Sequence, residues 1–216
     1  MIPHTGIYTL NLGPIPIQVW GLLVVVGLFV ALFFGRRIIT SKKLSEEIFF
    51  DLSFKILLGG FVGARLAHVF LYHFSDYAAD PFSILYIWQG GFSSIGGLAG
   101  AFIVLLWWRK KNKKTFWKYA DVLAYILPIA WFFGRIGCFL IHDHPGICTD
   151  FALGMRQSSG CSRHDLGLYE AILMLTIVAV FLAIYRRLKK VPESLYLGLF
   201  LVLYSIPRFM LDFLRM

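Results

Sequence analysis

Residues 119–141 read YADVLAYILPIAWFFGRIGCFLI, a run in which Asp121 and Arg135 are the charged side chains. A helix needs roughly 20 apolar residues to cross the hydrocarbon core of a bilayer, so this run is long enough for one crossing. An ionised side chain inside such a helix costs about 2.5 kcal/mol or more and by default marks a functional site. The run therefore predicts a membrane-spanning helix that carries a functional arginine.

The rest of the chain has the same apolar character. It has 216 residues, of which 58% are hydrophobic and 15% are charged, and its mean hydropathy is +0.72. Water-soluble domains are about 45–50% apolar and about 25% charged, so the composition excludes that class. We expect one integral-membrane domain spanning residues 1–216. Residues 1–13 lack a basic segment and a small-residue cleavage site, so no removable signal peptide is expected.

Hydrophobic runs predict an all-α, polytopic membrane helix bundle with about six transmembrane helices. The expected spans are Pro16 to Gly35, Glu47 to Tyr72, Gly90 to Trp108, Tyr119 to Ile141, Asp165 to Tyr185 and Ser194 to Leu214.

Basic residues set the expected orientation of this bundle. The net charge is +9, and 14 of the 21 Lys and Arg residues lie in the loops 36–43, 109–118 and 186–190. These three loops fall on one side of the membrane if the spans alternate. Because basic loops stay cytoplasmic, both termini are expected on the outer, periplasmic side. Topology explains this charge better than nucleic-acid binding does.

Four ionisable side chains lie inside the predicted spans at a similar depth, namely Arg65, Arg135, Glu170 and Arg208. At 1.5 Å rise per residue, each lies roughly 8–10 Å below the outer boundary. Asp212 follows Arg208 by one helical turn and shares its face. These charges either neutralise one another and hold the bundle together, or form a pocket for an anionic lipid headgroup. Three arginines against two acids favour the pocket, since the arginine fork binds phosphate in a bidentate manner.

Glycines at the outer start of the third span allow two interpretations. The stretch from Gly90 to Gly100 includes Gly96 and Gly97. Irregular backbone at membrane depth is tolerated where it lines a cavity, which would fit a lipid site. Small residues also let two helices pack closely, which needs no ligand.

With these segments in hand, the chain resembles the prolipoprotein diacylglyceryl transferase family from its first span to its C-terminus. The resemblance rests on five segments in the family's order: Gly60 to Arg65; Ile87 to Leu98; Asp121 with Gly134-Arg135-Ile136-Gly137; Arg163-His164 with Leu168-Tyr169-Glu170; and Tyr204, Arg208, Asp212 and Arg215. The chain departs from the family pattern at Ile95, where the family has histidine, and at Cys138, where it has asparagine. A further departure is the segment 142–146, HDHPG.

The resemblance implies an enzyme of the bacterial inner membrane with no cofactor and no resident metal. It would transfer a diacylglyceryl group from phosphatidylglycerol to the lipobox cysteine of a lipoprotein precursor at the periplasmic face, releasing glycerol phosphate. Two alternatives remain: a paralogue that modifies another acceptor from the same lipid pocket, and a non-catalytic lipid-binding or transport protein. No internal repeat of the kind that many transporters show is visible.

The reaction needs a positive site for the departing phosphate and a base for the thiol. We assign Arg135 and Arg208 to the phosphate, with Arg65 in support. Glu170 and Asp212 are expected to orient the arginines. Further substrate-binding candidates are Gly96, Gly97, Tyr169 and Tyr204.

Three outer histidines, His142, His144 and His164, are the candidates for the base that Ile95 does not supply. The alternatives are that they are ordinary loop residues, or that they bind zinc. In the same outer loop, Cys148 and Cys161 are candidates for a disulfide, since that side of the membrane is oxidising. Cys138 is either a small core residue or a reactive thiol.

Overall fold

The computed structural model describes residues 2–3, 6–12, 15–86, 90–156, 160–188 and 191–215. The chain divides into two compact units, one made of residues 1–41 and 120–216 and the other of residues 42–119. The predicted single membrane domain stays a prediction.

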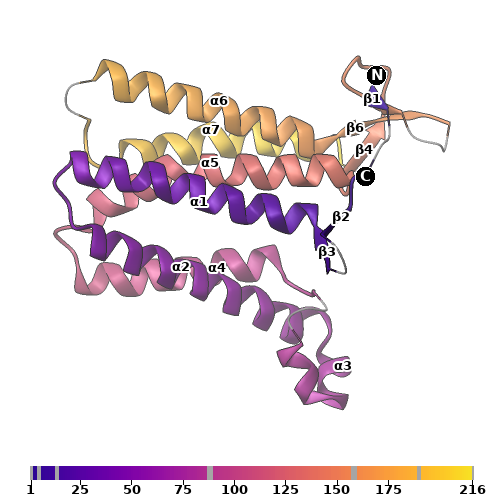
Figure 1. Cartoon of the computed structure of the whole chain (residues 1–216), viewed down its shortest axis with the longest axis horizontal. Coiled ribbons are helices and arrows are strands. Elements are labelled where there is room, and N and C mark those ends of the chain that lie inside the picture. The colour runs from indigo at the N-terminus through magenta and orange to yellow at the C-terminus, as the bar shows by residue number, and fades with distance from the viewer. Residues whose placement is uncertain are drawn as a thin grey trace. The chain divides into compact units, whose positions relative to one another are not determined.

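In the described part of the first unit, four long helices form its body (Figure 1): α1 (Val19–Ser41), α5 (Phe116–Ile141), α6 (Leu166–Arg187) and α7 (Leu195–Asp212). Residues 120–141 of α5 belong to this unit. Its core includes Tyr125, Phe181 and Tyr196 from three different helices, whose ring centroids lie 4.9–5.8 Å apart. Aromatic rings at these separations contribute packing beyond their buried area, so this cluster ties α5, α6 and α7 together.

Among the described residues, two small sheets lie at one end of these helices, and the sequence predicted neither of them. Strands β2 (Thr9–Leu12) and β3 (Ile15–Gln18) form an antiparallel pair. The other sheet has the order β1-β5-β6-β4, with bounds Ile2–Pro3, Met155–Arg156, Ser162–Asp165 and Pro145–Cys148. Strand β6 leads directly into α6, so the larger sheet fixes where that helix begins.

The second unit is built on the pair α2 (Glu46–Ala67) and α4 (Ser94–Lys111). Helix α2 continues as a π-helical turn, His68–Tyr72, and is followed by α3 (Phe74–Ala79) and a 3₁₀ turn, Pro81–Leu85. Glycines bring the pair into contact: a Cβ added at Gly63 would lie 2.5 Å from the carbonyl oxygen of Gly96, and one at Gly100 would overlap the carbonyl oxygen of Gly59. Close backbone approach of this kind is a common way for membrane helices to associate.

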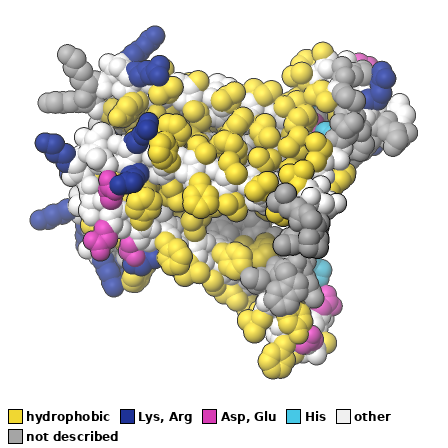
Figure 2. Space-filling model, in the orientation of Figure 1, with side chains coloured by type: hydrophobic (Ala, Val, Ile, Leu, Met, Phe, Trp, Pro, Cys, Tyr) yellow, Lys and Arg dark blue, Asp and Glu magenta, His cyan; other side chains and the backbone are white. Residues whose placement is uncertain are grey.

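Large apolar side chains on the long helices face outward. Phe29 and Leu98 are each 72% exposed, and Phe209 is 66% exposed. Figure 2 shows hydrophobic side chains covering the helix walls, with Lys and Arg gathered at helix ends. Lipid is the solvent that such walls require. The helical membrane fold is thus confirmed.

Among the residues that the structure describes, five helical segments are long and apolar enough to cross a membrane: Val19–Ser41, Glu46–Tyr72, Phe116–Ile141, Leu166–Arg187 and Leu195–Asp212. Helix α4 does not join them, because it has 18 residues and ends on three basic ones. The sixth crossing therefore stays a prediction, as does the placement of both termini on the periplasmic side. Trp88, Lys189 and Lys190 lie outside the described residues.

Two predicted span boundaries were wrong for local reasons. The first span was expected from Pro16 to Gly35, but Ile15–Gln18 pairs as β3, so the helix begins at Val19 and runs to Ser41. The third was expected from Gly90, but Gly90 and Gly91 have φ of +80° and +79°. That left-handed backbone cannot belong to a right-handed helix, so α4 begins at Ser94.

Helix packing in the second unit predicts a contrast between two glycine positions. We expect Gly100→Ala to cost about 1–3 kcal/mol of stability, because the new methyl group would overlap backbone that has no room to yield. Gly60→Ala is the matched control, since its Cβ would lie 3.4 Å from the nearest atom, the carbonyl oxygen of Gly97. Thermal unfolding in detergent measures both, and equal midpoints would contradict the packing role.

Candidate functional site

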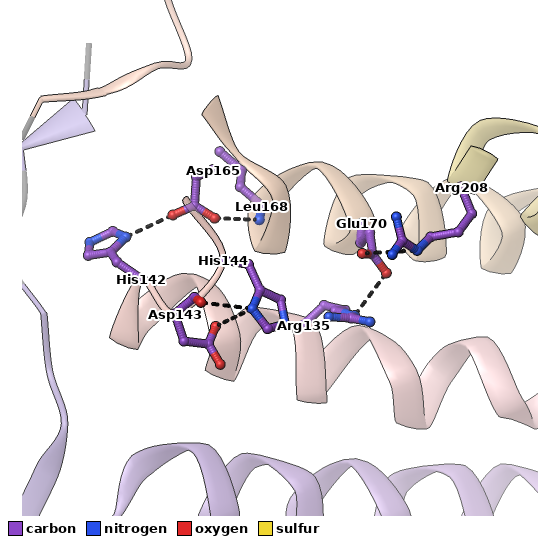
Figure 3. A network of polar contacts seen from close by, with 8 residues as sticks. All are labelled: Arg135, His142, Asp143, His144, Asp165, Leu168, Glu170 and Arg208. Carbon is purple, nitrogen blue, oxygen red and sulfur yellow. Dashed lines mark hydrogen bonds and ion pairs between the residues drawn. The ribbon is translucent and has the colours of Figure 1, made fainter. Parts of the chain in front are cut away.

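A buried carboxylate lies between two arginines in the first unit (Figure 3). Glu170 on α6 is 2% exposed. Its Oε2 lies 2.9 Å from Nε of Arg135 on α5, and its Oε1 lies 3.6 Å from Nε of Arg208 on α7. One acid therefore connects three helices at the depth where the sequence placed these charges.

The second acid contacts the same site from a more exposed position. Asp212 Oδ1 accepts a hydrogen bond from Nη1 of Arg208 at 2.9 Å, and its side chain is 51% exposed. Tyr204 lies one turn before Arg208 on α7, and its ring stacks on that of Phe200. Both acids therefore contact the arginines, and their role in orienting them for a substrate stays a prediction.

The way Glu170 engages the arginines leaves them able to bind a further anion. A guanidinium carries five N–H donors. Glu170 lies against the Nε of each arginine, and Asp212 takes Nη1 of Arg208. The side chains of Arg135 and Arg208 remain 18% and 25% exposed. Because the terminal nitrogens form the fork that binds phosphate oxygens, the arrangement is suited to a phosphate that enters from the exposed side.

A second buried acid fixes the turn that follows α5. Asp165 is the N-cap of α6, where its Oδ1 accepts a hydrogen bond from the backbone N–H of Leu168. Its Oδ2 lies 2.8 Å from Nδ1 of His142, and the two side chains are 1% and 4% exposed. His142 has φ of +50°, a left-handed conformation that is uncommon outside glycine. The contact with Asp165 thus holds an unusual turn, which makes His142 a positioning residue.

That turn brings Asp143 and His144 back over the end of α5. The donor atoms of Cys138, Asp143 and His144 all lie within 4.8 Å of one another. Zinc accepts thiolate, carboxylate and imidazole donors. Within the described ranges, this trio is therefore the group that could hold a metal ion. The zinc alternative took His142, His144 and His164 as ligands. Only His144 of these belongs to the trio, so that set of ligands is wrong. Cys138 is buried and free.

The third histidine contacts a tyrosine of the site. His164 Nδ1 lies 2.8 Å from the hydroxyl oxygen of Tyr169, the residue before Glu170. Burial lowers the pKa of the His164 imidazole below its ordinary value, because a buried ring resists taking up charge. His164 is therefore neutral near pH 7 and leaves Nε2 for another partner.

Arg65, Gly96 and Gly97 belong to the second unit. The Arg65 guanidinium donates to backbone carbonyls, Nε to Ile84 at 3.0 Å, Nη2 to Ser83 at 2.8 Å and Nη1 to Gly90 at 2.5 Å. Its side chain is buried, so it holds the chain segment before α4 in place. Gly96 serves the packing of α4 on α2. The roles of these residues in substrate binding stay predictions.

Two further features of the first unit join distant segments. Cys148 and Cys161 form a disulfide, as the oxidising outer loop led us to expect. Asp121 Oδ1 accepts hydrogen bonds from the backbone N–H groups of Tyr196 at 2.7 Å and Leu197 at 3.1 Å. Asp121 thus satisfies the start of α7, a role that sequence reasoning missed because the partners lie some 75 residues away.

The sequence of the chain matches a known protein family. The model of the prolipoprotein diacylglyceryl transferase family matches residues 8–216. The phosphatidylglycerol–prolipoprotein diacylglyceryl transferase of Ectopseudomonas mendocina is 33% identical over 222 residues, which cover 100% of this chain and 83% of that protein. The protein of the same name from Photobacterium profundum is 32% identical, over 95% of this chain and 79% of its own length.

The two acids of the site predict very different stability effects. We expect Glu170→Gln to destabilise the protein by about 3–5 kcal/mol, because two guanidinium groups lose their buried counter-charge. Asp212→Asn removes a half-exposed partner and should cost at most about 1 kcal/mol. Unfolding midpoints in detergent compare them, and an equal loss in both variants would contradict the central position given to Glu170.

Proposed function

Because the chain belongs to the prolipoprotein diacylglyceryl transferase family, we propose that its arginine pair binds the lipid phosphate during diacylglyceryl transfer. The protein is a phospholipid-dependent transferase of the bacterial inner membrane, and its substrates are phosphatidylglycerol and a lipoprotein precursor. The observation that carries the proposal is the position of Glu170, which meets the Nε of both Arg135 and Arg208. Both guanidinium groups are thereby oriented, and their donors other than Nε and the Arg208 Nη1 that meets Asp212 are proposed to face the phosphate.

The reaction places two demands on these residues. The thiolate of the acceptor cysteine attacks the glyceryl carbon that bears the phosphate, so that a carbon–sulfur bond forms as the carbon–oxygen bond breaks. Glycerol phosphate leaves with the electron pair of that bond, and Arg135 and Arg208 stabilise the charge that develops on its oxygen. Glu170 and Asp212 keep the arginines oriented through the step, which avoids reorganisation as charge builds up.

Proton removal from the thiol is the second demand, and His144 is the best-placed base. Cys138 follows Arg135 by one helical turn, and the His144 ring lies within reach of the Cys138 sulfur. His144 therefore lies beside the end of α5, the helix that carries Arg135. Its side chain is 42% exposed. The His142 side chain is only 4% exposed and meets Asp165, which suits positioning better than proton transfer. His164 beside Tyr169 is the second candidate.

The arginine assignment predicts a loss of catalysis without a loss of fold. We expect Arg135→Lys and Arg208→Lys each to lower kcat about 100- to 1,000-fold, because lysine keeps the charge but lacks the fork. The assay incubates purified protein with phosphatidylglycerol and a lipobox peptide and measures the mass gain of the peptide. Lys55→Arg at the half-exposed Asp51 pair is a control for altered charge geometry elsewhere. Full activity in both arginine variants would overturn the assignment.

The base assignment predicts a pH signature. His144→Ala should lower kcat/KM about 100-fold or more near pH 7, the usual contribution of a general base. Activity of this variant should then rise about tenfold per pH unit toward the thiol pKa of about 8.5, because hydroxide takes over proton removal. A merely structural role of His144 would not produce this recovery. If His164→Ala shows the recovery and His144→Ala does not, the base is His164.

A further inference from the structure

A cavity of about 490 Å³ lies in the second unit, where α4 ends and α5 begins. Its lining consists of Leu106, Arg109, Lys110, Lys113 and Trp117. Leu106 and Lys110 are four residues apart and share one face of α4, and Lys113 lies in the turn that follows this helix. The described transfer site uses none of these residues.

The lining carries three positive charges and no acid. Among the residues the structure describes, no carboxylate forms an ion pair with Arg109, Lys110 or Lys113. The Arg109 guanidinium lies over the rings of Phe116 and Trp117, 5.7 Å and 5.5 Å from their centroids. Those ring faces orient the cation without neutralising it, so the cavity keeps a net positive charge.

The corner that forms the cavity is built on a fixed core. Trp108 is 5% exposed and packs against Phe116 and Tyr119, with ring centroids 6.1 Å and 5.6 Å away. The Tyr119 hydroxyl accepts a hydrogen bond from the backbone N–H of Ser45 at 3.0 Å, and Asn112 Nδ2 donates to the carbonyl of Trp108 at 3.2 Å. The walls of the cavity are therefore held apart by the fold itself.

We propose that this cavity binds an anionic phospholipid from the leaflet at this end of the helices. The headgroup phosphate contacts Arg109, Lys110 and Lys113, and an acyl chain follows the exposed, apolar side of α4 at Leu106. Basic cavities beside membrane helices recognise anionic headgroups in this way, and Trp117 is a residue type enriched at the headgroup level. An orientation signal requires only the number of basic residues, whereas this chain also arranges three of them around one cavity.

This lipid is distinct from the lipid that reacts. Trp117 and Arg135 both lie on α5, and at 1.5 Å per residue they are separated by about 27 Å along that helix. The hydrocarbon core of a bilayer is about 30 Å thick. The separation along α5 is thus close to the thickness of one bilayer core, which is too long for one phosphate to meet both Trp117 and Arg135.

Native mass spectrometry with matched charge variants tests the proposal. The variant K110Q/K113Q removes two cations from the lining, and K111Q/K114Q removes two from the same segment but outside it. With dioleoyl phosphatidylglycerol and no acceptor peptide, K110Q/K113Q should retain one lipid fewer than wild type, with about 30-fold weaker affinity at that site. The control variant should match wild type, and dioleoyl phosphatidylcholine should show no difference among the three proteins.

Two results would overturn the proposal. One is equal retention of phosphatidylglycerol by K110Q/K113Q and K111Q/K114Q, which would mean that charge near the membrane, and not the cavity, holds the lipid. The other is displacement of the lipid by excess inorganic phosphate, which would identify a site for soluble anions. Because binding is measured without acceptor, neither result depends on the roles assigned to Arg135 and Arg208.

Discussion

A carboxylate buried at membrane depth must have a positive partner, and the first unit is organised around that requirement. Glu170 is nearly inaccessible, so its ionised form would be very unstable there without the guanidinium groups of Arg135 and Arg208. Each partner comes from a different helix. The ion pairs of Glu170 therefore set the relative positions of α5, α6 and α7. They also bring the two arginines to the same carboxylate.

The position of Glu170 in turn depends on a second buried acid at the start of the same helix. Asp165 caps α6 and thereby fixes where its first turn begins, and Glu170 follows one turn later. The other oxygen of Asp165 meets His142 and holds the turn that carries Asp143 and His144. A single carboxylate thus couples the helix of the phosphate site to the loop of the candidate base. This arrangement places His144 beside Cys138 at the end of α5.

The sequence predicted those parts of the structure that depend on local composition. Long apolar runs and the depth of each charge were sufficient to predict the helices and the grouping of Arg135, Glu170 and Arg208. Contacts between distant segments were not predictable, because no local pattern encodes them. Asp121 is an example. In the sequence it is one acid in an apolar helix, but in the structure its Oδ1 accepts a hydrogen bond from the backbone N–H of Tyr196 in the first turn of α7. Arg65 is another, since its charge suggested phosphate binding while its donors meet backbone carbonyls.

The cations of this chain differ in what surrounds them, and this difference separates their roles. Arg135 and Arg208 share an acid, so they can remain at membrane depth when no lipid is bound, and the transfer site can release its product. Among the described residues, Arg109, Lys110 and Lys113 have no carboxylate partner, and they lie where the chain is richest in basic residues. A site that must exchange its ligand in every turnover benefits from a counter-charge that remains when the ligand leaves. A site that keeps one lipid has no such need, and the absence of acids from the lining of the cavity fits a lipid that stays.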